Sequence, residues 1–361
     1  MEGVREPLAA PSLADIASAR ERLRGIATRT PLVRLGADVP GGAEVWLKLE
    51  NLQPIGSFKL RGVVIRTPLV RLNVDDAPAE IYLKLENLQP IGSFKLRGAG
   101  NAMASAAPET LAGGVYTASA GNMAQGLAWT ARRAGVPCRV LVPEHAPATK
   151  LAAIERLGAT YTKLPFDDWW KVLMEHEHPG MTGLFVHPVS AGAVMAGNGT
   201  IGLELLEDLP ALDAVVVPYG GGGLSCGIAA AVKALKPGIK VYAAEVETSA
   251  AFAASRAAGK PTTITYTPSF VDGIGSPRVL EEMWPLASTL LDGSIVVSLA
   301  EVGAALRLMA ERNRVIAEGA GAVGVAAALT GKAGRGNVAC VVSGGNIDSA
   351  KLCAVLRGEI P

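Results

Sequence analysis

The sequence predicts an α/β protein of two lobes, each with a parallel sheet flanked by helices. From residue 114 onward, short apolar segments alternate with alanine-rich segments that favour helix, and this alternation is typical of βαβ units. A second series of the same kind begins near Gly199. In that series a run of four glycines, residues 220–223, separates an apolar strand from a helix. A ligand is therefore expected between the lobes, at the carboxyl ends of the strands.

The individual elements follow from the spacing of apolar residues and from residues that cap or break helices. The first helix is predicted over residues 12–29, with Ser12 as its N-cap. Strands are predicted over residues 81–86, 114–119, 138–143, 160–165, 214–219, 240–247 and 338–342. Further helices are predicted over residues 121–135, 148–159, 201–209, 224–237, 299–312 and 321–329.

The composition argues against several classes of protein. With 361 residues the chain is long enough for two domains or one large two-lobed unit. Its formal net charge of +1 indicates no nucleic-acid partner, and no apolar stretch is long and charge-free enough to span a membrane. The first residues show no secretory signal, and the four cysteines have no metal-ligand spacing. We therefore expect a cytoplasmic protein with reduced, buried thiols.

A lysine between two glycines is the first candidate for a functional residue. Lys95 lies in residues 92–98, Gly-Ser-Phe-Lys-Leu-Arg-Gly, shortly after the strand predicted over residues 81–86. A lysine amine attacks a carbonyl group only in its neutral form, which apolar and desolvated surroundings favour. Phe94 and Leu96 provide apolar neighbours. Lys95 is thus a candidate nucleophile, and a solvated surface lysine is the alternative.

The region around Lys95 occurs twice in the chain. Residues 47–62 and 83–98 share the sequence LKLENLQPIGSFKLRG without a substitution, and residues 29–35 and 66–72 are both RTPLVRL. A single repeat does not build a solenoid, so we interpret it as a local tandem duplication. The duplication introduces a second candidate lysine, Lys59.

The residues that follow each copy favour Lys95 over Lys59. After Gly98 come small, helix-compatible residues with the sequence AGNAMASAA. After Gly62 come β-branched residues and then Pro68, which cannot continue a helix. We therefore predict that Lys95 is the functional copy.

The four glycines and the residue after them, Leu224, form a second candidate site. A glycine loop between a strand and a helix exposes backbone N–H groups at the positive end of the helix dipole, which favours an anion. Consecutive glycines lose much conformational entropy on folding, so a compensating contact is expected. The pattern is neither a P-loop nor a dinucleotide fingerprint. A phosphate group is the predicted ligand, and a flexible turn is the alternative.

Two short polar segments follow other predicted strands. Residues 119–122, Ser-Ala-Gly-Asn, precede a helix, and their N–H groups and the Ser119 hydroxyl would hold a carboxylate. Asn122 would donate a hydrogen bond to a phenolic oxygen. Ser343, which begins Ser-Gly-Gly-Asn after the last strand, would donate one to a ring nitrogen. Helix capping by Ser119 or Asn122 and an ordinary turn at Ser343 are the alternatives.

These motifs together resemble those of a known family. The segments RTPL, KLENLQPIGSFKLRG, ASAGNMAQG, GTIGLEL, GGGGLS, EGAGA and SGGN run through almost the whole chain. They resemble the fold type II (tryptophan synthase β-like) pyridoxal-phosphate enzymes, specifically the serine/threonine dehydratase and serine racemase group. The resemblance implies a large cofactor-binding domain of residues 1–113 and 192–361, which contains the duplicated segment 29–98. It also implies a small substrate-gating domain of residues 114–191 and a homodimer.

The resemblance also implies a role for each motif. Lys95 would hold pyridoxal 5'-phosphate as a Schiff base and remove the α-proton of the substrate. The cofactor-binding residues would be Lys95, Phe94, Asn122, Gly220, Gly221, Gly222, Gly223, Leu224 and Ser343. The residues that bind the substrate carboxylate would be Ser119, Ala120, Gly121 and Asn122. A serine, rather than an aspartate, at the ring nitrogen would favour rapid loss of a β-hydroxyl group.

Two departures from the family pattern refine these expectations. Ala120 stands where racemases of the group carry a second serine, and alanine cannot transfer a proton. Ser249 and Ala251 follow Glu245 where further ligands of a divalent cation would be expected, so no metal site is predicted.

Bulky side chains in the predicted small domain raise the question of substrate size. Met123 replaces a histidine common in this loop, and Trp169 and Trp170 add bulk. An aryl-bearing substrate such as phenylserine is therefore conceivable, but packing in the core is the favoured explanation for all three residues.

The predicted function is a pyridoxal-phosphate-dependent dehydratase. It would convert a small-molecule amino acid, L-threonine, L-serine or threo-phenylserine, to a 2-oxo acid and ammonia. The alternatives are a serine racemase, a β-replacement synthase, and a cofactor-binding protein that the duplicated segment impairs in catalysis. A regulatory domain is not expected, because the chain ends soon after SGGN.

Overall fold

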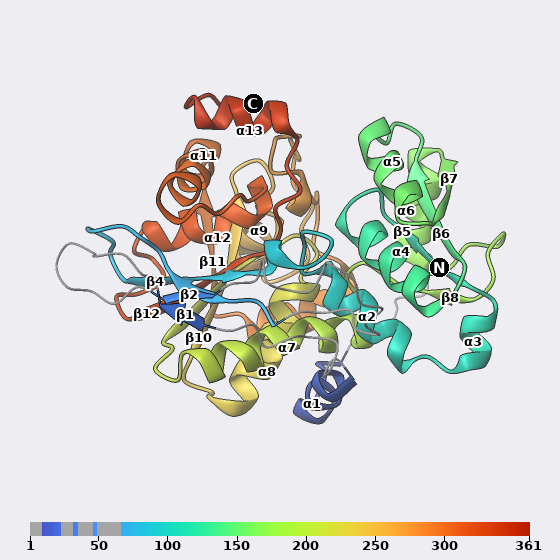
Figure 1. Ribbon diagram of the computed structural model, residues 1–361, viewed down its shortest axis with the longest axis horizontal. Coiled ribbons are helices and arrows are strands. Elements are labelled where there is room, and N and C mark those ends of the chain that lie inside the picture. Colours follow the sequence, from blue (N-terminus) through green and yellow to red (C-terminus); the bar gives the residue numbers. More distant parts are fainter. Residues whose placement is uncertain (1–8, 23–31, 35–45, 49–65) are drawn as a thin grey trace.

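The computed structural model describes residues 9–22, 32–34, 46–48 and 66–361. Their strands form a six-stranded sheet, a four-stranded sheet and a separate two-stranded sheet. Helices flank the two larger sheets, and the four-stranded sheet lies to one side of the six-stranded sheet (Figure 1). The predicted α/β class with two parallel sheets is therefore confirmed.

The six-stranded sheet has the order β11-β10-β9-β12-β4-β3. Its strands are β3 (Leu69–Arg71), β4 (Glu80–Leu85), β9 (Ala214–Pro218), β10 (Lys240–Val246), β11 (Gly293–Val297) and β12 (Asn337–Val342). Neighbouring strands are parallel except for the edge strand β3, which is antiparallel to β4. The four-stranded sheet is parallel, with the order β7-β6-β5-β8. Its strands are β5 (Val115–Ala118), β6 (Cys138–Pro143), β7 (Thr160–Leu164) and β8 (Leu184–Phe185).

Most helices connect strands that follow one another in the chain, because parallel strands need a long crossover connection. The helices up to β9 are α1 (Leu13–Arg22), η2 (Glu86–Leu88), α2 (Lys95–Ser105), α3 (Pro108–Ala112), α4 (Asn122–Ala134), α5 (Ala148–Arg156), α6 (Phe166–Glu175) and α7 (Gly192–Asp208). The later helices are α8 (Gly223–Leu235), α9 (Ala251–Ala258), η3 (Asp272–Ile274), η4 (Glu281–Met283), α10 (Trp284–Leu290), α11 (Leu299–Leu308), η5 (Met309–Asn313), α12 (Gly319–Leu329) and α13 (Ser349–Leu356). None of the helices in the described ranges is long and apolar enough to cross a bilayer.

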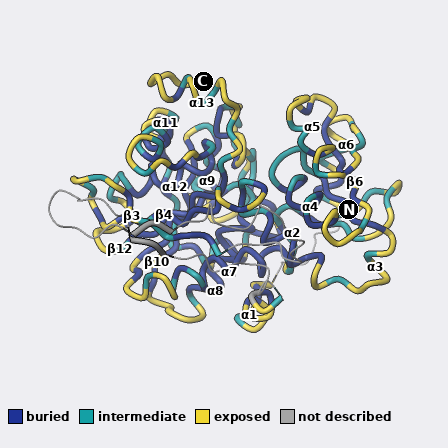
Figure 2. Tube along the Cα trace, in the orientation of Figure 1, coloured by how far each residue is buried: buried dark blue, intermediate teal, exposed yellow. Residues whose placement is uncertain are grey.

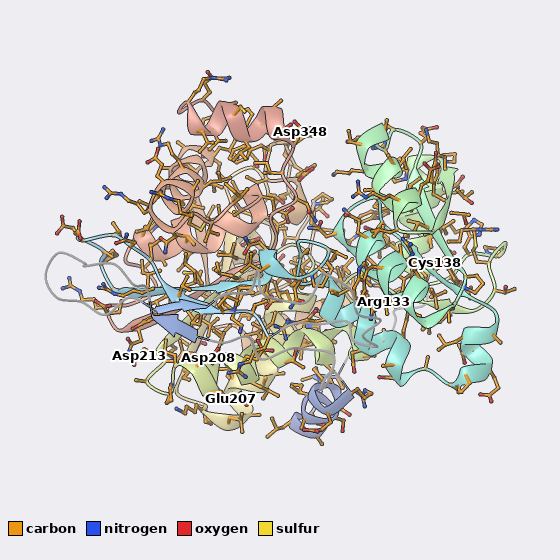
Figure 3. The ribbon with its side chains drawn as sticks, in the orientation of Figure 1. Arg133, Cys138, Glu207, Asp208, Asp213 and Asp348 are labelled. Atoms are coloured by element: carbon orange, nitrogen blue, oxygen red, sulfur yellow. The ribbon has the colours of Figure 1, made fainter. Side chains whose placement is uncertain are left out.

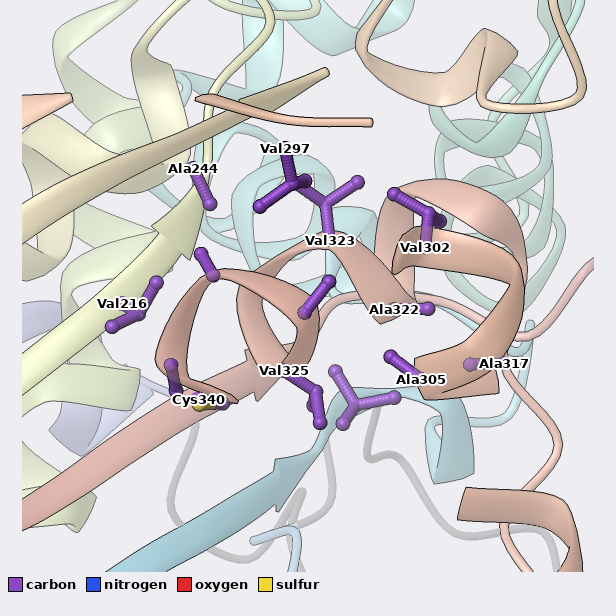
Figure 4. Close-up of a cluster of buried hydrophobic side chains, with 14 of the residues drawn as sticks. Val216, Ala244, Val297, Val302, Ala305, Ala317, Ala322, Val323, Val325 and Cys340 are labelled. Carbon is purple, nitrogen blue, oxygen red and sulfur yellow. The ribbon is translucent and has the colours of Figure 1, made fainter. Parts of the chain in front are cut away.

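Helix α12 lies in the main buried cluster, beside the six-stranded sheet. It contains only glycine, alanine, valine and leucine, and a helix that is apolar on all sides is expected to be buried. In Figure 4, Val323 of α12 lies near Val297 of β11, and Val325 lies below it near Cys340 of β12. Figure 2 shows that buried segments occupy the interior of both lobes. The core thus holds the carboxyl ends of the strands in fixed positions.

Helix α7 is longer than the sequence predicts. It begins at Gly192, not near residue 201. Its glycines let the backbones of neighbouring elements approach closely. A Cβ atom at Gly197 would lie 2.4 Å from the carbonyl oxygen of Arg97, and one at Gly199 would lie 2.9 Å from that of Gly227. Glycine lowers helix propensity, so the sequence alone places the helix start too late.

Helix α1 confirms the predicted N-cap. The backbone N–H of Asp15 donates a hydrogen bond of 3.1 Å to the Ser12 hydroxyl, and the Asp15 carboxylate accepts one of 2.9 Å from the Ser12 N–H. This reciprocal pair satisfies N–H groups that a helix start leaves without partners. The predicted end of this helix, residues 23–29, lies outside the described residues.

The two-stranded sheet repeats a pairing of the six-stranded sheet. Strands β1 (Leu32–Arg34) and β2 (Trp46–Lys48) pair antiparallel, with Leu32 opposite Lys48. In β3 and β4 the equivalent residues of the second copy, Leu69 and Lys84, are also paired. The spacers between the strands differ in sequence and length, so the repeated segments themselves specify this register.

Buried charges join β4, α2 and α7. The Arg97 guanidinium, which is 1% exposed, donates hydrogen bonds to Glu86 at 2.7 and 2.8 Å and to Glu204 at 2.8 and 3.0 Å. The Lys84 ammonium is 2.6 Å from Oε2 of Glu204, which also accepts the 3.0 Å hydrogen bond from Arg97. At the end of α7, Arg66 contacts Glu207 and Asp208, which are labelled in Figure 3. These ion pairs connect the segment before Lys95, and α2, to helix α7.

Candidate active site

The segment that carries Lys95 pairs with the end of the last strand. Ser93 forms an isolated antiparallel bridge with Gly344, and the Phe94 N–H donates a hydrogen bond of 3.0 Å to the carbonyl oxygen of Ser343. Because β4 and β12 are parallel neighbours, their carboxyl ends meet at one edge of the sheet. The predicted lysine and the predicted Ser343 therefore lie side by side.

The Lys95 amine is desolvated, as the sequence predicts for a nucleophile. Its Nζ donates a hydrogen bond of 2.6 Å to the carbonyl oxygen of Pro188 and lies 5.0 Å from the centre of the Phe94 ring. Burial lowers the pKa of the amine to about 8, although the nearby Glu318 carboxyl partly opposes this shift. A substantial fraction of the amine is therefore neutral near physiological pH.

The glycine loop stands between β9 and α8, where an anion would meet free N–H groups. Gly222 precedes α8 in the left-handed region, at φ 92°, and no side chain caps the helix. A Cβ atom at Gly221 would lie 2.6 Å from Val189, and one at Gly223 would lie 2.4 Å from the Val189 carbonyl oxygen. The glycines are thus required by this contact, and the first N–H groups of α8 have no intrahelical partner.

Ser119 follows the carboxyl end of β5 in the four-stranded sheet, and Asn122 is the first residue of α4. The Asn122 side chain donates a hydrogen bond of 2.9 Å to Glu318 and accepts one of 2.8 Å from Asn346. Helix α4 begins after Gly121 without a side-chain cap, so the helix-capping alternative is wrong. Instead, the Ser119 hydroxyl accepts a hydrogen bond of 3.2 Å from the Gly121 N–H. Ala120, like its neighbours, is partly exposed.

Glu318 belongs to the site, and the sequence analysis gave it no role. The segment EGAGA contributes to the family resemblance, but only the structure brings this carboxyl next to Asn122. Burial raises the pKa of Glu318 to about 7; the nearby Asp272 raises it further, and the hydrogen bond from Asn122 opposes the shift. Its proton is therefore exchanged near neutral pH, beside the amine of Lys95.

The remaining sequence predictions fall into two groups. Met123 is 1% exposed and packs in a hydrophobic cluster, and Trp169 and Trp170 pack on another, in agreement with a role in the core. The Glu245 carboxylate accepts hydrogen bonds of 2.8 Å from two backbone N–H groups of α9 and one of 2.6 Å from Ser294. The absence of a metal site stays a prediction.

The lysine of the first copy is not among the residues that the structure describes. Lys59 lies outside the described residues, so the structure describes only Lys95 at this edge of the six-stranded sheet. The choice between the two lysines stays a prediction.

The residues present fit a phosphorylated aldehyde. Lys95 offers a desolvated amine, and a side chain at Gly221 or Gly223 of the glycine loop would collide with Val189. The chain also offers the amide of Asn122, which is hydrogen-bonded to Glu318, and the buried Ser343, whose carbonyl oxygen accepts from the Phe94 N–H. An α/β fold with such a site defines a class of enzyme in which a lysine would bind an anionic carbonyl cofactor.

Comparison with known proteins identifies the family. A family model described as pyridoxal-phosphate dependent enzyme matches residues 63–344. The chain therefore belongs to this family and is a pyridoxal-phosphate-dependent enzyme of fold type II. The predicted fold class and the predicted cofactor are confirmed.

Named relatives carry two different activities. L-threonine ammonia-lyase of Thermotoga maritima is 41% identical over 343 residues, which cover 93% of this chain and 76% of the relative. Serine racemase of Rattus norvegicus is 38% identical over 272 residues, which cover 72% and 81%, respectively. The structure of maize serine racemase aligns with a TM-score of 0.79 at 29% identity, covering 97% of this chain and 98% of that chain.

Replacing Glu318 by glutamine is expected to flatten the pH dependence of stability. The folded carboxyl has a pKa of about 7 against 4.5 for the free group, so the folded state binds this proton more tightly. Its contribution to the free energy of unfolding is fully present below about pH 4.5 and is lost as the pH rises through 7. The loss amounts to as much as about 3 kcal/mol. Urea unfolding of cofactor-free protein at pH 5 and pH 8 measures the difference. An equal pH dependence in both proteins would contradict the proposed proton on Glu318.

Proposed function

We propose that the enzyme dehydrates and deaminates a β-hydroxy-α-amino acid, with pyridoxal phosphate bound through Lys95. The observation that carries this proposal is the desolvated Lys95 amine, with its pKa of about 8, beside Ser343 and within one residue of the glycine-loop contact. The similarity to L-threonine ammonia-lyase across almost the whole chain supports the choice of reaction.

The proposed cofactor site uses four parts of the chain. The N–H groups at residues 220–224 hold the phosphate, and the Asn122 amide donates to the ring oxygen. Glu318 and Asn346 fix the orientation of that amide by hydrogen bonds of 2.9 and 2.8 Å. Ser343 serves the ring nitrogen, because its backbone is bonded to Phe94, next to the lysine.

The chemistry requires removal of one proton and loss of one hydroxyl group. When bound, pyridoxal phosphate withdraws electrons from the bonds at the substrate α-carbon. The neutral Lys95 amine accepts the α-proton, and the N–H groups of residues 119–122 hold the carboxylate. The Cα–H and Cβ–O bonds break, and the proton taken up by Lys95 leaves with the β-hydroxyl group as water. The enamine product takes up water again, so the net products are a 2-oxo acid and ammonia, and no oxidant is needed.

Serine racemase is the second candidate, because a relative and a similar solved structure carry that name. Racemisation needs an acid or base on each face of the substrate. Ala120 offers no exchangeable proton between Ser119 and Gly121, on the segment proposed to bind the carboxylate. Elimination, which needs proton removal on one face only, is therefore the favoured reaction.

Product analysis tests the proposal. With L-threonine, L-serine or threo-phenylserine, at least one substrate is expected to yield a 2-oxo acid and ammonia in equal amounts, with D-serine below one tenth of the pyruvate from L-serine. A dehydrogenase-coupled assay, an ammonia assay and chiral chromatography measure the three products. D-serine as the main product would favour the racemase, and no product from any substrate would favour the impaired cofactor-binding protein.

Location, domain division and assembly belong to the same proposal. All four cysteines are free and three are buried, which supports a reducing cytoplasm. The four-stranded sheet uses only residues between 115 and 185, which supports a small domain of residues 114–191 and a large domain of residues 1–113 and 192–361. The homodimer implied by the family resemblance is checked by light scattering of the purified protein.

A further inference from the structure

Residues 187–190, called the 187–190 segment below, contact both halves of the proposed cofactor site. The carbonyl oxygen of Pro188 accepts the hydrogen bond from the Lys95 amine, at 2.6 Å. The next residue, Val189, lies against the glycine loop, where Cβ atoms at Gly221 and Gly223 would come within 2.6 and 2.4 Å of it. A movement of this one segment would therefore displace the lysine contact and the loop contact together.

The shape of the segment is fixed by His187. Its Nδ1 accepts hydrogen bonds from the backbone N–H groups of Val189, at 3.1 Å, and of Ser190, at 2.6 Å. The side chain is buried, and burial lowers its pKa well below the usual value, as does the neighbouring His176. A neutral imidazole with Nδ1 as acceptor holds the backbone of the segment in one conformation.

Ser190 connects the segment to two other elements. Its hydroxyl is 2.9 Å from Nδ1 of His187 and 3.2 Å from Nε2 of His176, the residue directly after α6. Nε2 of His176 is in turn 3.7 Å from the Glu282 carboxylate in η4. Burial raises the pKa of Glu282, but hydrogen bonds from His176, from a backbone N–H and from Ser190 together lower it to about 2, so this group is a carboxylate.

The contacts of Ser190 join the two lobes. His176 follows α6, which packs on the four-stranded sheet, whereas Glu282 precedes α10, which packs on α8. Ser190 is 2% exposed, so water would not replace the hydrogen-bond partners that its hydroxyl group contacts if these were lost. The proposed binding roles use none of these three side chains.

We propose that Ser190, held by His176 and Glu282, is a positioning residue that keeps the 187–190 segment against Lys95 and the glycine loop. Lys95 and the glycine loop are thereby held in the relative positions that binding of one cofactor molecule requires. This inference rests on the proposed cofactor site. Replacing Ser190 by alanine removes the hydroxyl group that contacts His176 and His187. The segment is then held only by the hydrogen bonds between His187 and its backbone. The Lys95 contact and the Val189 contact both loosen.

Cofactor affinity and hydrogen exchange test the proposal. The Kd of pyridoxal phosphate, from absorbance titration of cofactor-free protein, is expected to rise about tenfold in Ser190→Ala and to rise less in Glu282→Gln. Amide exchange in cofactor-free protein is expected to become faster in residues 187–190 and 219–224. The matched control is Ser255→Ala, another buried serine with hydrogen bonds of 2.7 and 3.0 Å, which lies in α9. It is expected to change neither quantity by more than about twofold.

Equal Kd values and equal exchange in the Ser190 and Ser255 variants would overturn the proposal. Thermal unfolding of both variants separates a loss of stability from the specific effect, because both changes remove a buried hydroxyl. If Lys95→Ala binds the cofactor as well as the unchanged protein does, the proposed site fails, and the exchange measurement still decides the role of Ser190.

Discussion

The Lys95→Ala variant is expected to lose the absorbance of lysine-bound cofactor completely and its activity by at least about 10²–10⁴-fold. The variant lacks both the amine that binds the cofactor and the proposed base. The identical copy provides the matched control, because Lys59 has the same neighbours in sequence. Lys59→Ala is expected to keep the absorbance band and the activity. Spectra of the purified proteins and the 2-oxo acid assay measure both effects.

The residues after each lysine give the physical reason for this difference. In α2, Ala99 and Asn101 are fully buried, and a Cβ atom at Gly197 of α7 would lie 2.9 Å from the Asn101 Cβ. If the first copy occupied this place, Ile65 would stand at the position of Asn101 and Pro68 would interrupt the helix. Proline inside a helix costs about 3 kcal/mol. Loss of the absorbance band in Lys59→Ala, and its retention in Lys95→Ala, would show that the first copy occupies the site.

The Arg97→Met variant is expected to lose about 3–5 kcal/mol of stability toward unfolding. Methionine fills a similar volume but leaves the Glu86 carboxylate, which is fully buried, without its bidentate partner. Burial raises the pKa of Glu204, while Arg97 and Lys84 together lower it to about 2, so the variant also loses one of the two cations that stabilise this carboxylate. Unpaired buried charges are among the most destabilising changes in a protein.

Urea unfolding of cofactor-free protein measures this loss, and Arg61→Met is the matched control. Arg61 occupies the position of Arg97 in the first copy, and we expect its replacement to change the free energy of unfolding by less than about 0.5 kcal/mol. If the two variants are equally stable, the buried charge cluster does not depend on the second copy.

Local patterns predict the strands and the glycine loop well. Strand β6 and the prediction coincide at residues 138–143, because its run of apolar residues is bounded by turn-forming ones. The glycine loop lies between β9 and α8 as predicted, since only glycine fits against Val189. In contrast, the predicted start of α7 is wrong. The glycines of α7 are needed for close packing against α2, and the local sequence does not reveal this contact.

The side chains that complete the site are the least predictable part. Glu318 and Pro188 are remote in sequence from Asn122 and Lys95, which they contact. His187 and Ser190 form no motif that indicates a contact with the glycine loop. These contacts result from the packing of the two lobes, and the spacing of residues along the chain does not predict that packing.

By itself the sequence determined the fold class, the family with its cofactor, and the register of the repeated hairpin, because each depends on short segments with strong local preferences. The tertiary structure alone decided which groups surround Lys95. Burial lowers the pKa of the Lys95 amine to about 8, and burial raises the pKa of the Glu318 carboxyl to about 7. Desolvation depends on every element that packs around a group, so it exists only in the folded chain.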